Sequence, residues 1–205
     1  MRNIDGRYAL HSASSTQWGI AMTFAVIEGP ALEPVTLDEL KLALRIDSDD
    51  LDADLAMLIQ SAREQAEHET GLFLMPQVVR LDLTDWPTDL LIKRAPVSAI
   101  TSIQYWDGSA WQTVDDASYV FYPEGTMWRI DPDSGWPSLG NGRGPRVRVL
   151  FAAGFASAAA VPAVAKRFII AQVGAWLSNP EATTADRMEL SPLFSRMLDP
   201  IRIYA

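Results

Sequence analysis

The sequence contains no cysteine and only two histidines, His11 and His68. Without cysteine the chain has no disulfide framework, thiol nucleophile or cysteine-ligated metal, which suits a reducing compartment. Two histidines leave little for a Ser-His-Asp arrangement or a histidine metal site. We therefore predict that the protein is not an enzyme and that it has no catalytic residue, metal or cofactor.

Basic residues are also scarce. The chain has 17 Lys and Arg against 26 Asp and Glu, which gives a formal net charge of -9. Proteins that bind nucleic acids tightly use clustered Lys and Arg to neutralise phosphates. The excess of acidic over basic residues therefore argues against tight nucleic-acid binding. DNA that passes close to this protein should be repelled.

Long apolar runs are absent near the amino end. The longest, Gly19 to Ile27, is too short to span a bilayer. Arg2 and Arg7 precede it as in a secretory signal, but no clean Ala-x-Ala cleavage site follows. We interpret residues 1–31 as an extension or arm, with Met22 as an alternative start, and expect no membrane partner.

Two helices are predicted after this arm. Thr36 and Glu39 form a capping box that begins a helix over 36–45. A second helix is predicted over 50–69, and Gly71 follows it as a left-handed terminator. Apolar residues recur at helical spacing in both segments: Leu37, Leu40, Leu44, Leu55, Leu58, Ile59, Ala62 and Ala66.

From Val78 the apolar residues alternate, which predicts an antiparallel β module over residues 78–154. Asp107-Gly108 indicates a hairpin with a type I′ turn, since both turn positions need positive φ. A third helix is predicted over 162–177, beginning at Pro162 and apolar on more than one face. Residues 181–190 read as a polar linker before an apolar carboxyl end.

Three local patterns are typical of metal, catalytic or sugar-binding sites, but each also has a structural explanation. The aspartates from Asp47 to Asp54 lack the glycine and glutamate of a calcium loop, and they suit a helix start instead. Asp115 and Asp116 are adjacent on a predicted strand, so they point to opposite faces and form a poor hydrolase pair. Trp106 and Trp111 flank the hairpin turn, where they stack on sugars, pack across the hairpin or pack on a neighbouring subunit.

Several segments together resemble the phage head-to-tail connector, or adaptor, family in order and spacing. They are Val35-Thr36-Leu37-Asp38-Glu39, Leu42-Ala43-Leu44-Arg45-Ile46-Asp47, Ala62-Arg63-Glu64, Glu69-Thr70-Gly71, Arg94-Ala95-Pro96-Val97, Ile100-Thr101-Ser102-Ile103, Val147 to Phe155, Val161-Pro162 and Leu198-Asp199-Pro200-Ile201-Arg202. The likeness covers about residues 32–205, and Ile201 stands where the family usually has tyrosine. Similar proteins occur in prophages and gene transfer agents.

This resemblance implies an α+β fold, with the β module inserted between helices two and three of a small helical bundle. The implied domains are 1–31 as the arm, 32–77 with 155–180 as the connector domain, 78–154 as the insertion, and 181–205 as linker and tail. The implied function is a structural adaptor of the virion neck, assembled in the bacterial host cytoplasm. The alternatives from the residues are a carbohydrate-binding module and an acid hydrolase.

The resemblance also implies partners. It implies a dodecameric ring, with the portal protein above, a stopper or tail-terminator protein below, and DNA passing without specific binding. The predicted portal-binding residues are Leu193, Phe194, Met197, Leu198, Ile201, Arg202 and Tyr204. The residues predicted for subunit contacts or the DNA channel are Asp49, Asp50, Asp52, Asp54, Trp106 and Trp111.

Overall fold

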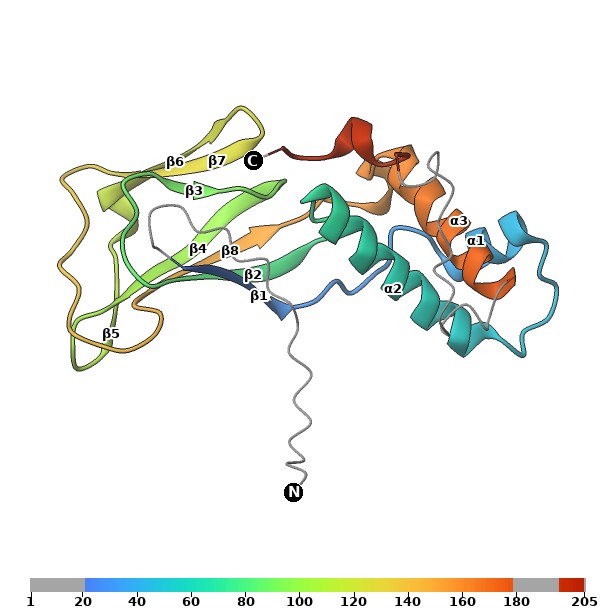
Figure 1. Cartoon of the computed structure of the whole chain (residues 1–205), viewed down its shortest axis with the longest axis horizontal. Helices are drawn as coiled ribbons and strands as arrows, with labels where there is room; N and C mark the ends of the chain where they lie inside the picture. Colours follow the sequence, from blue (N-terminus) through green and yellow to red (C-terminus); the bar gives the residue numbers. More distant parts are fainter. Residues whose placement is uncertain (1–20, 179–195, 205) are drawn as a thin grey trace, which may run out of the picture.

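The computed structural model describes residues 21–178 and 196–204. Figure 1 shows a helical part and a β part lying end to end along the longest axis of the molecule. Each part has its own hydrophobic core, and the chain passes between the two parts around residues 29–36, 71–77 and 153–161.

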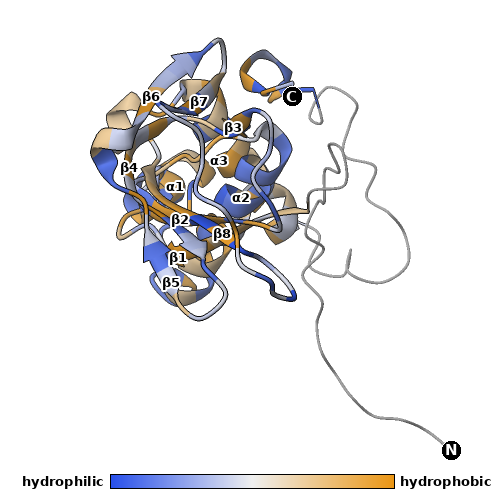
Figure 2. Ribbon diagram, turned by 90° about the vertical axis from the view of Figure 1, so that its left-hand side faces the viewer, coloured by the Kyte–Doolittle hydropathy of each residue, from blue (hydrophilic) through white to orange (hydrophobic). Residues whose placement is uncertain are grey.

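The β part consists of two antiparallel sheets. One has the order β1 (Met22–Glu28), β2 (Gln77–Leu83), β8 (Val147–Ala153), β4 (Val97–Trp106) and β5 (Trp111–Thr113). The other has the order β3 (Leu90–Ile92), β7 (Met127–Pro132) and β6 (Tyr119–Glu124). Figure 2 views this part from its end, with β3, β6 and β7 above the larger sheet.

The alternation of apolar residues explains this packing. In β2 and β8 every second side chain is buried, because successive side chains of a strand point to opposite faces. The buried set of both sheets forms one cluster: Phe73, Val79, Leu81, Leu83, Leu90, Ile92, Val97, Ile103, Val114, Ile130, Val147, Val149, Phe151 and Ala153. The two sheets therefore close over a shared core.

The helical part contains α1 (Leu37–Leu44), α2 (Asp52–Thr70) and α3 (Ala163–Ser178), with short 3₁₀ turns η2 (Ala158–Ala160) and η3 (Asp199–Ile201). The capping box at Thr36 is present, because its hydroxyl accepts from the Glu39 N–H and the Glu39 carboxylate accepts from the Thr36 N–H. Buried residues from all three helices make the second core, which includes Leu40, Leu55, Ile59, Phe168 and Ile169.

These elements confirm the three predicted helices to within two residues at each end, and they confirm a mixed α+β fold. Strands β2 to β8 lie between α2 and α3 in the chain, together with the short 3₁₀ turn η1 (Asp116–Ser118). Strand β1 was not predicted: residues 22–28 of the predicted arm pair antiparallel with β2 and form an edge of the larger sheet. Met22 and Phe24, two residues apart, lie on one face of the strand and pack against the β core, with Phe24 edge-on against Phe151.

The predicted hairpin at Asp107 is present, but its turn type was wrong. Trp106 pairs with Trp111, so the loop has four residues, and Gly108 alone among them has positive φ. The Asp107 carboxylate accepts from the backbone N–H groups of Ser109 and Ala110 at 2.7 and 2.8 Å. These hydrogen bonds lower the pKa of Asp107 well below its usual range.

The exit of β8 depends on glycine. Gly154 has φ +104° and donates its N–H to the Pro96 carbonyl at 2.9 Å. A Cβ atom built there would lie 1.9 Å from the Met75 carbonyl oxygen. The chain can therefore leave the sheet toward α3 only because this residue has no side chain.

We predict that Gly154→Ala lowers the free energy of unfolding by about 2 kcal/mol or more, because the left-handed conformation and the contact with Met75 both penalise a Cβ. Gly29→Ala is the control, since nothing lies within 4 Å of its added Cβ. Urea unfolding of both variants measures the difference. Equal losses would show that the close approach at Gly154 does not constrain the fold.

Candidate interaction surfaces

The junction between the two parts is built around the buried side chain of Glu67, near the end of α2. Its Oε1 accepts from the Leu74 N–H at 2.8 Å and from the Gln77 side-chain amide at 3.0 Å. Its Oε2 accepts from Arg63 at 3.1 Å, and Arg63 also donates to Glu33 at 2.8 Å. One carboxylate thus joins α2, the segment that enters β2 and the segment that enters α1.

Burial dominates the electrostatics of Glu67. Desolvation raises its pKa above the ordinary glutamate value, although the Leu74 N–H, the Arg63 and Arg94 guanidinium groups and the Gln77 amide act to lower it. Arg94 donates to the Glu67 backbone carbonyl at 2.8 Å and lies over the Phe73 ring, with 4.4 Å to the ring centroid. The junction therefore contains acidic and basic groups that stabilise one another electrostatically.

We predict that Glu67→Leu lowers the free energy of unfolding by about 2–3 kcal/mol, because it leaves buried donors without an acceptor. Glu67→Gln keeps an acceptor and should lose less. Because the raised pKa makes the folded state take up a proton before the unfolded state, the wild type should gain stability relative to Glu67→Gln as the pH falls toward the unfolded value of about 4.3. Urea unfolding between pH 7 and pH 4 measures this, and a difference that does not change with pH would contradict it.

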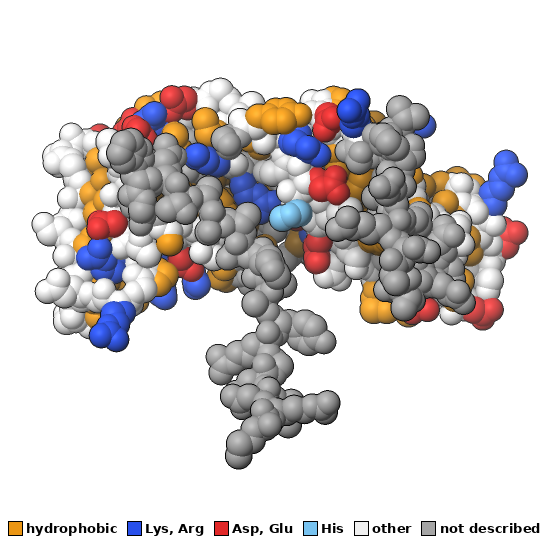
Figure 3. All heavy atoms as spheres, viewed as in Figure 1, with side chains coloured by type: hydrophobic (Ala, Val, Ile, Leu, Met, Phe, Trp, Pro, Cys, Tyr) orange, Lys and Arg blue, Asp and Glu red, His pale blue; other side chains and the backbone are white. Residues whose placement is uncertain are grey.

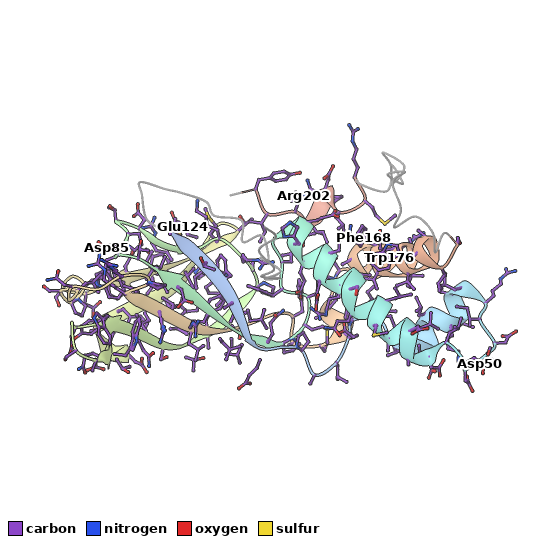
Figure 4. The ribbon with its side chains drawn as sticks, turned by 60° about the horizontal axis from the view of Figure 1, so that its bottom comes forward. Asp50, Asp85, Glu124, Phe168, Trp176 and Arg202 are labelled. Carbon is purple, nitrogen blue, oxygen red and sulfur yellow. The ribbon has the colours of Figure 1, made fainter. Side chains whose placement is uncertain are left out.

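The predicted channel aspartates lie at the end of the helical part farthest from the sheets. Figure 4 shows Asp50 there, with Asp85 at the opposite end of the molecule. Lys41 of α1 donates to Asp49 at 2.5 Å and to Asp52 at 2.8 Å, which fixes the connection between α1 and α2. Asp50 accepts from the Ser48 hydroxyl at 2.7 Å, and Asp54 is exposed in the first turn of α2.

These aspartates are thus grouped in space, as their sequence spacing suggests. The Lys41 contact lowers the pKa of Asp49 and so keeps it ionised. The helix begins at Asp52 rather than at 50, so Asp49 and Asp50 precede it. Figure 3 shows acidic and basic side chains interspersed on the face of the molecule that Figure 1 views.

Trp106 and Trp111 contact each other across the hairpin, with ring centroids 5.9 Å apart in an edge-to-face arrangement. The Trp106 indole donates to the Asn141 carbonyl at 3.2 Å, and the Arg148 guanidinium lies 3.9 Å from the Trp111 ring centroid. Both rings are partly buried by these contacts. The packing explanation therefore accounts for the contacts of both rings.

The carboxyl end packs on the molecule's own helices. Leu198 is fully buried in the helical core, and Met197, Ile201 and Ile203 pack against that core. The Ile203 N–H donates to the Thr70 carbonyl at 2.7 Å. Leu198 would have to leave the core to contact a portal protein, whereas Tyr204 is 73% exposed.

Two other predicted tail residues, Leu193 and Phe194, lie outside the described residues. Arg202 forms an ion pair with Asp199 at 3.5 Å. Sequence reasoning missed the attachment of the tail to α2, because the pattern of an apolar terminus does not show which surface it covers. Figure 4 places Arg202 above the end of α2.

An open apolar pocket of about 350 Å³ lies on the helical part. It was not predicted from the sequence, because its walls come from three separate segments. The lining residues are Ala31, Leu32, Glu33, Val35, Thr36, Leu37, Ala56, Ile59 and Ala158. Leu32 on its rim is 72% exposed, so the pocket opens onto an apolar surface.

Within residues 21–178 and 196–204, no group of three or more His, Cys, Asp and Glu side chains is arranged to hold a metal ion. In the same ranges, no helix is both long enough and apolar enough to cross a membrane. The surfaces described above consist of packed aromatic rings, ion pairs and apolar patches.

The fold is shared with chains of several solved particles. A chain from the neck of an empty gene transfer agent (GTA) particle, computed with C6 symmetry, matches with a TM-score of 0.74 and 20% identity over 89% of this chain and 96% of that chain. A chain from the virion of a native GTA particle has a TM-score of 0.72 with the same identity and coverage. One from the neck of a native GTA particle, computed with C12 symmetry, has a TM-score of 0.64 and 22% identity, over 87% of this chain and 96% of that chain.

The sequence comparison gives the family. Residues 34–132 match the profile described as Phage gp6-like head-tail connector protein. No curated protein matches the sequence. The resemblance to the phage head-tail connector family drawn from the sequence is confirmed over residues 34–132.

Proposed function

We propose that this protein is a structural adaptor of the virion neck. In this role it forms a ring beneath the portal, joins the DNA-filled head to the stopper or tail, and leaves a passage for DNA. The observation that carries the proposal is the match to GTA neck chains, which covers 96% of those chains. The protein would act in the particle after assembly in the bacterial host cytoplasm.

A ring of several copies is supported by the symmetry of the matched particles, whose necks were computed with C6 and C12 symmetry. We propose twelve copies here. Rings need heterologous contacts, in which one surface of a subunit meets a different surface of the next. The exposed apolar side chains of the helical part provide such surfaces, among them Leu32, Leu42 and Met57.

We predict that the full chain, mixed with the portal protein of the same particle, forms portal-bound rings, because family members share a connector role and assembly on a template lowers the ordering cost. Negative-stain images and native mass spectrometry of the mixture measure the complex and its copy number. Portal alone is the control. Portal particles that never retain this protein would contradict the proposal.

The channel for DNA is a further part of the proposal. Asp49, Asp50, Asp52 and Asp54 sit together at one end of the molecule, and the chain has a net charge of -9. A lumen lined by carboxylates would repel the phosphate backbone, so DNA would pass without binding. This role requires that the end bearing Asp50 faces the axis of the ring.

The structure also narrows which tail residues can contact the portal. Tyr204 is exposed and its removal opens no cavity in the core, whereas Leu198 is part of the core. We therefore propose Tyr204 and the adjacent Arg202 as the portal-facing residues of the described tail. Leu198 would hold the tail on its own subunit.

We predict that Leu198→Ala lowers the free energy of unfolding by about 2–5 kcal/mol, because it leaves a cavity in the helical core. Tyr204→Ala should change stability by less than about 0.5 kcal/mol and yet weaken attachment to the portal. Thermal unfolding and co-sedimentation with portal particles separate the two effects. If Tyr204→Ala attaches as the wild type does, Tyr204 does not contact the portal.

A further inference from the structure

The pocket on the helical part is a recess without an occupant among the described residues. Its walls are the segment that leads into α1, Ala56 and Ile59 of α2, and the 3₁₀ turn η2. Apart from Glu33 and Thr36, all its lining residues are apolar. Such a recess excludes a charged or strongly hydrated ligand and suits an aliphatic side chain.

The helical part also carries an apolar side chain that projects into solvent. Leu42 of α1 is 83% exposed, the highest value among the exposed large hydrophobic residues. Leu40 and Leu44, on the opposite side of the helix, pack in the core or against it. Leu42 therefore points away from its own subunit, and it does not line the pocket.

The charged residues beside Leu42 and beside the pocket have opposite signs. Arg45 comes three residues after Leu42, at the left-handed C-cap of α1. It is exposed and forms no ion pair with any described residue. Glu33 lines the pocket, where its carboxylate accepts from Arg63 and keeps further acceptor capacity. A guanidinium brought in beside Leu42 would meet this carboxylate.

We propose that Leu42 of one copy inserts into this pocket of a second copy, with Arg45 next to Glu33. The proposal rests on the proposed function, since it specifies one contact of the ring. A protruding side chain that fits a recess elsewhere on an identical molecule makes a heterologous contact, which is the type that builds rings. The exposed residues Leu32 and Met57 extend the apolar surface around the pocket and would be covered by the neighbouring α1.

The absence of cysteine makes a direct test simple. Leu42→Cys and Ala56→Cys are introduced together in the full chain, with and without portal particles, and a short thiol-specific cross-linker is added. Denaturing gels should show a ladder of covalent multimers, because each copy then has one thiol on each side of the contact. The single variants have one thiol per copy and can give no product beyond a dimer. Val120→Cys with Ala56→Cys is the matched control, since Val120 is 50% exposed but lies on β6.

A second variant tests the energetics. Leu42→Asp should leave thermal unfolding unchanged, because the side chain is exposed, and should lower the association constant by more than about tenfold, because a carboxylate would enter an apolar recess. A ladder specific to the Leu42 and Ala56 pair supports the contact. Rings on portal particles without that ladder would overturn the contact while the proposed function stands. Absence of any portal-bound wild-type complex would instead count against the proposed function, and a ladder seen in that case would still support contact between copies.

Discussion

The position of the sheets relative to the helices depends on the buried carboxylate of Glu67. A carboxylate taken out of water must accept hydrogen bonds, and this one accepts from Leu74, Gln77 and Arg63. Those partners belong to the start of the β part and to α2 itself. These hydrogen bonds form in the arrangement in which the two parts meet here, which gives the junction a specific geometry.

The chain around this carboxylate serves both cores. Leu72, Leu74 and Met75 are buried in the helical core, whereas Phe73 is buried in the β core. Gly154, which follows β8, packs against Met75, which precedes β2. The segment that enters the β part and the segment that leaves it are therefore in contact. Because successive residues here anchor different cores, bending the junction would expose apolar surface on both sides.

The proposed function depends on surfaces rather than on reactive groups. The paired tryptophans, the Lys41 bridge and the packed tail each use side chains that looked available in the sequence, but which the fold occupies with internal contacts. The exposed large apolar side chains lie on α1, on α2, in the segments before these helices, on β1 and β6, and at the carboxyl end. These residues are the ones that a neighbouring molecule can cover.

The sequence by itself determined the helices, the presence of the β module and the resemblance to the head-tail connector family. Helical spacing, the Thr36 capping box and the alternation after Val78 are local signals, and local hydrogen bonding and side-chain direction produce them directly. The role of Met22–Glu28 as an edge strand, the burial of Leu198, the buried Glu67 network and the pocket were decided only by the tertiary structure. Each of these depends on contacts between segments far apart in the chain. The sequence around an apolar or charged residue does not show which distant residue its side chain will contact.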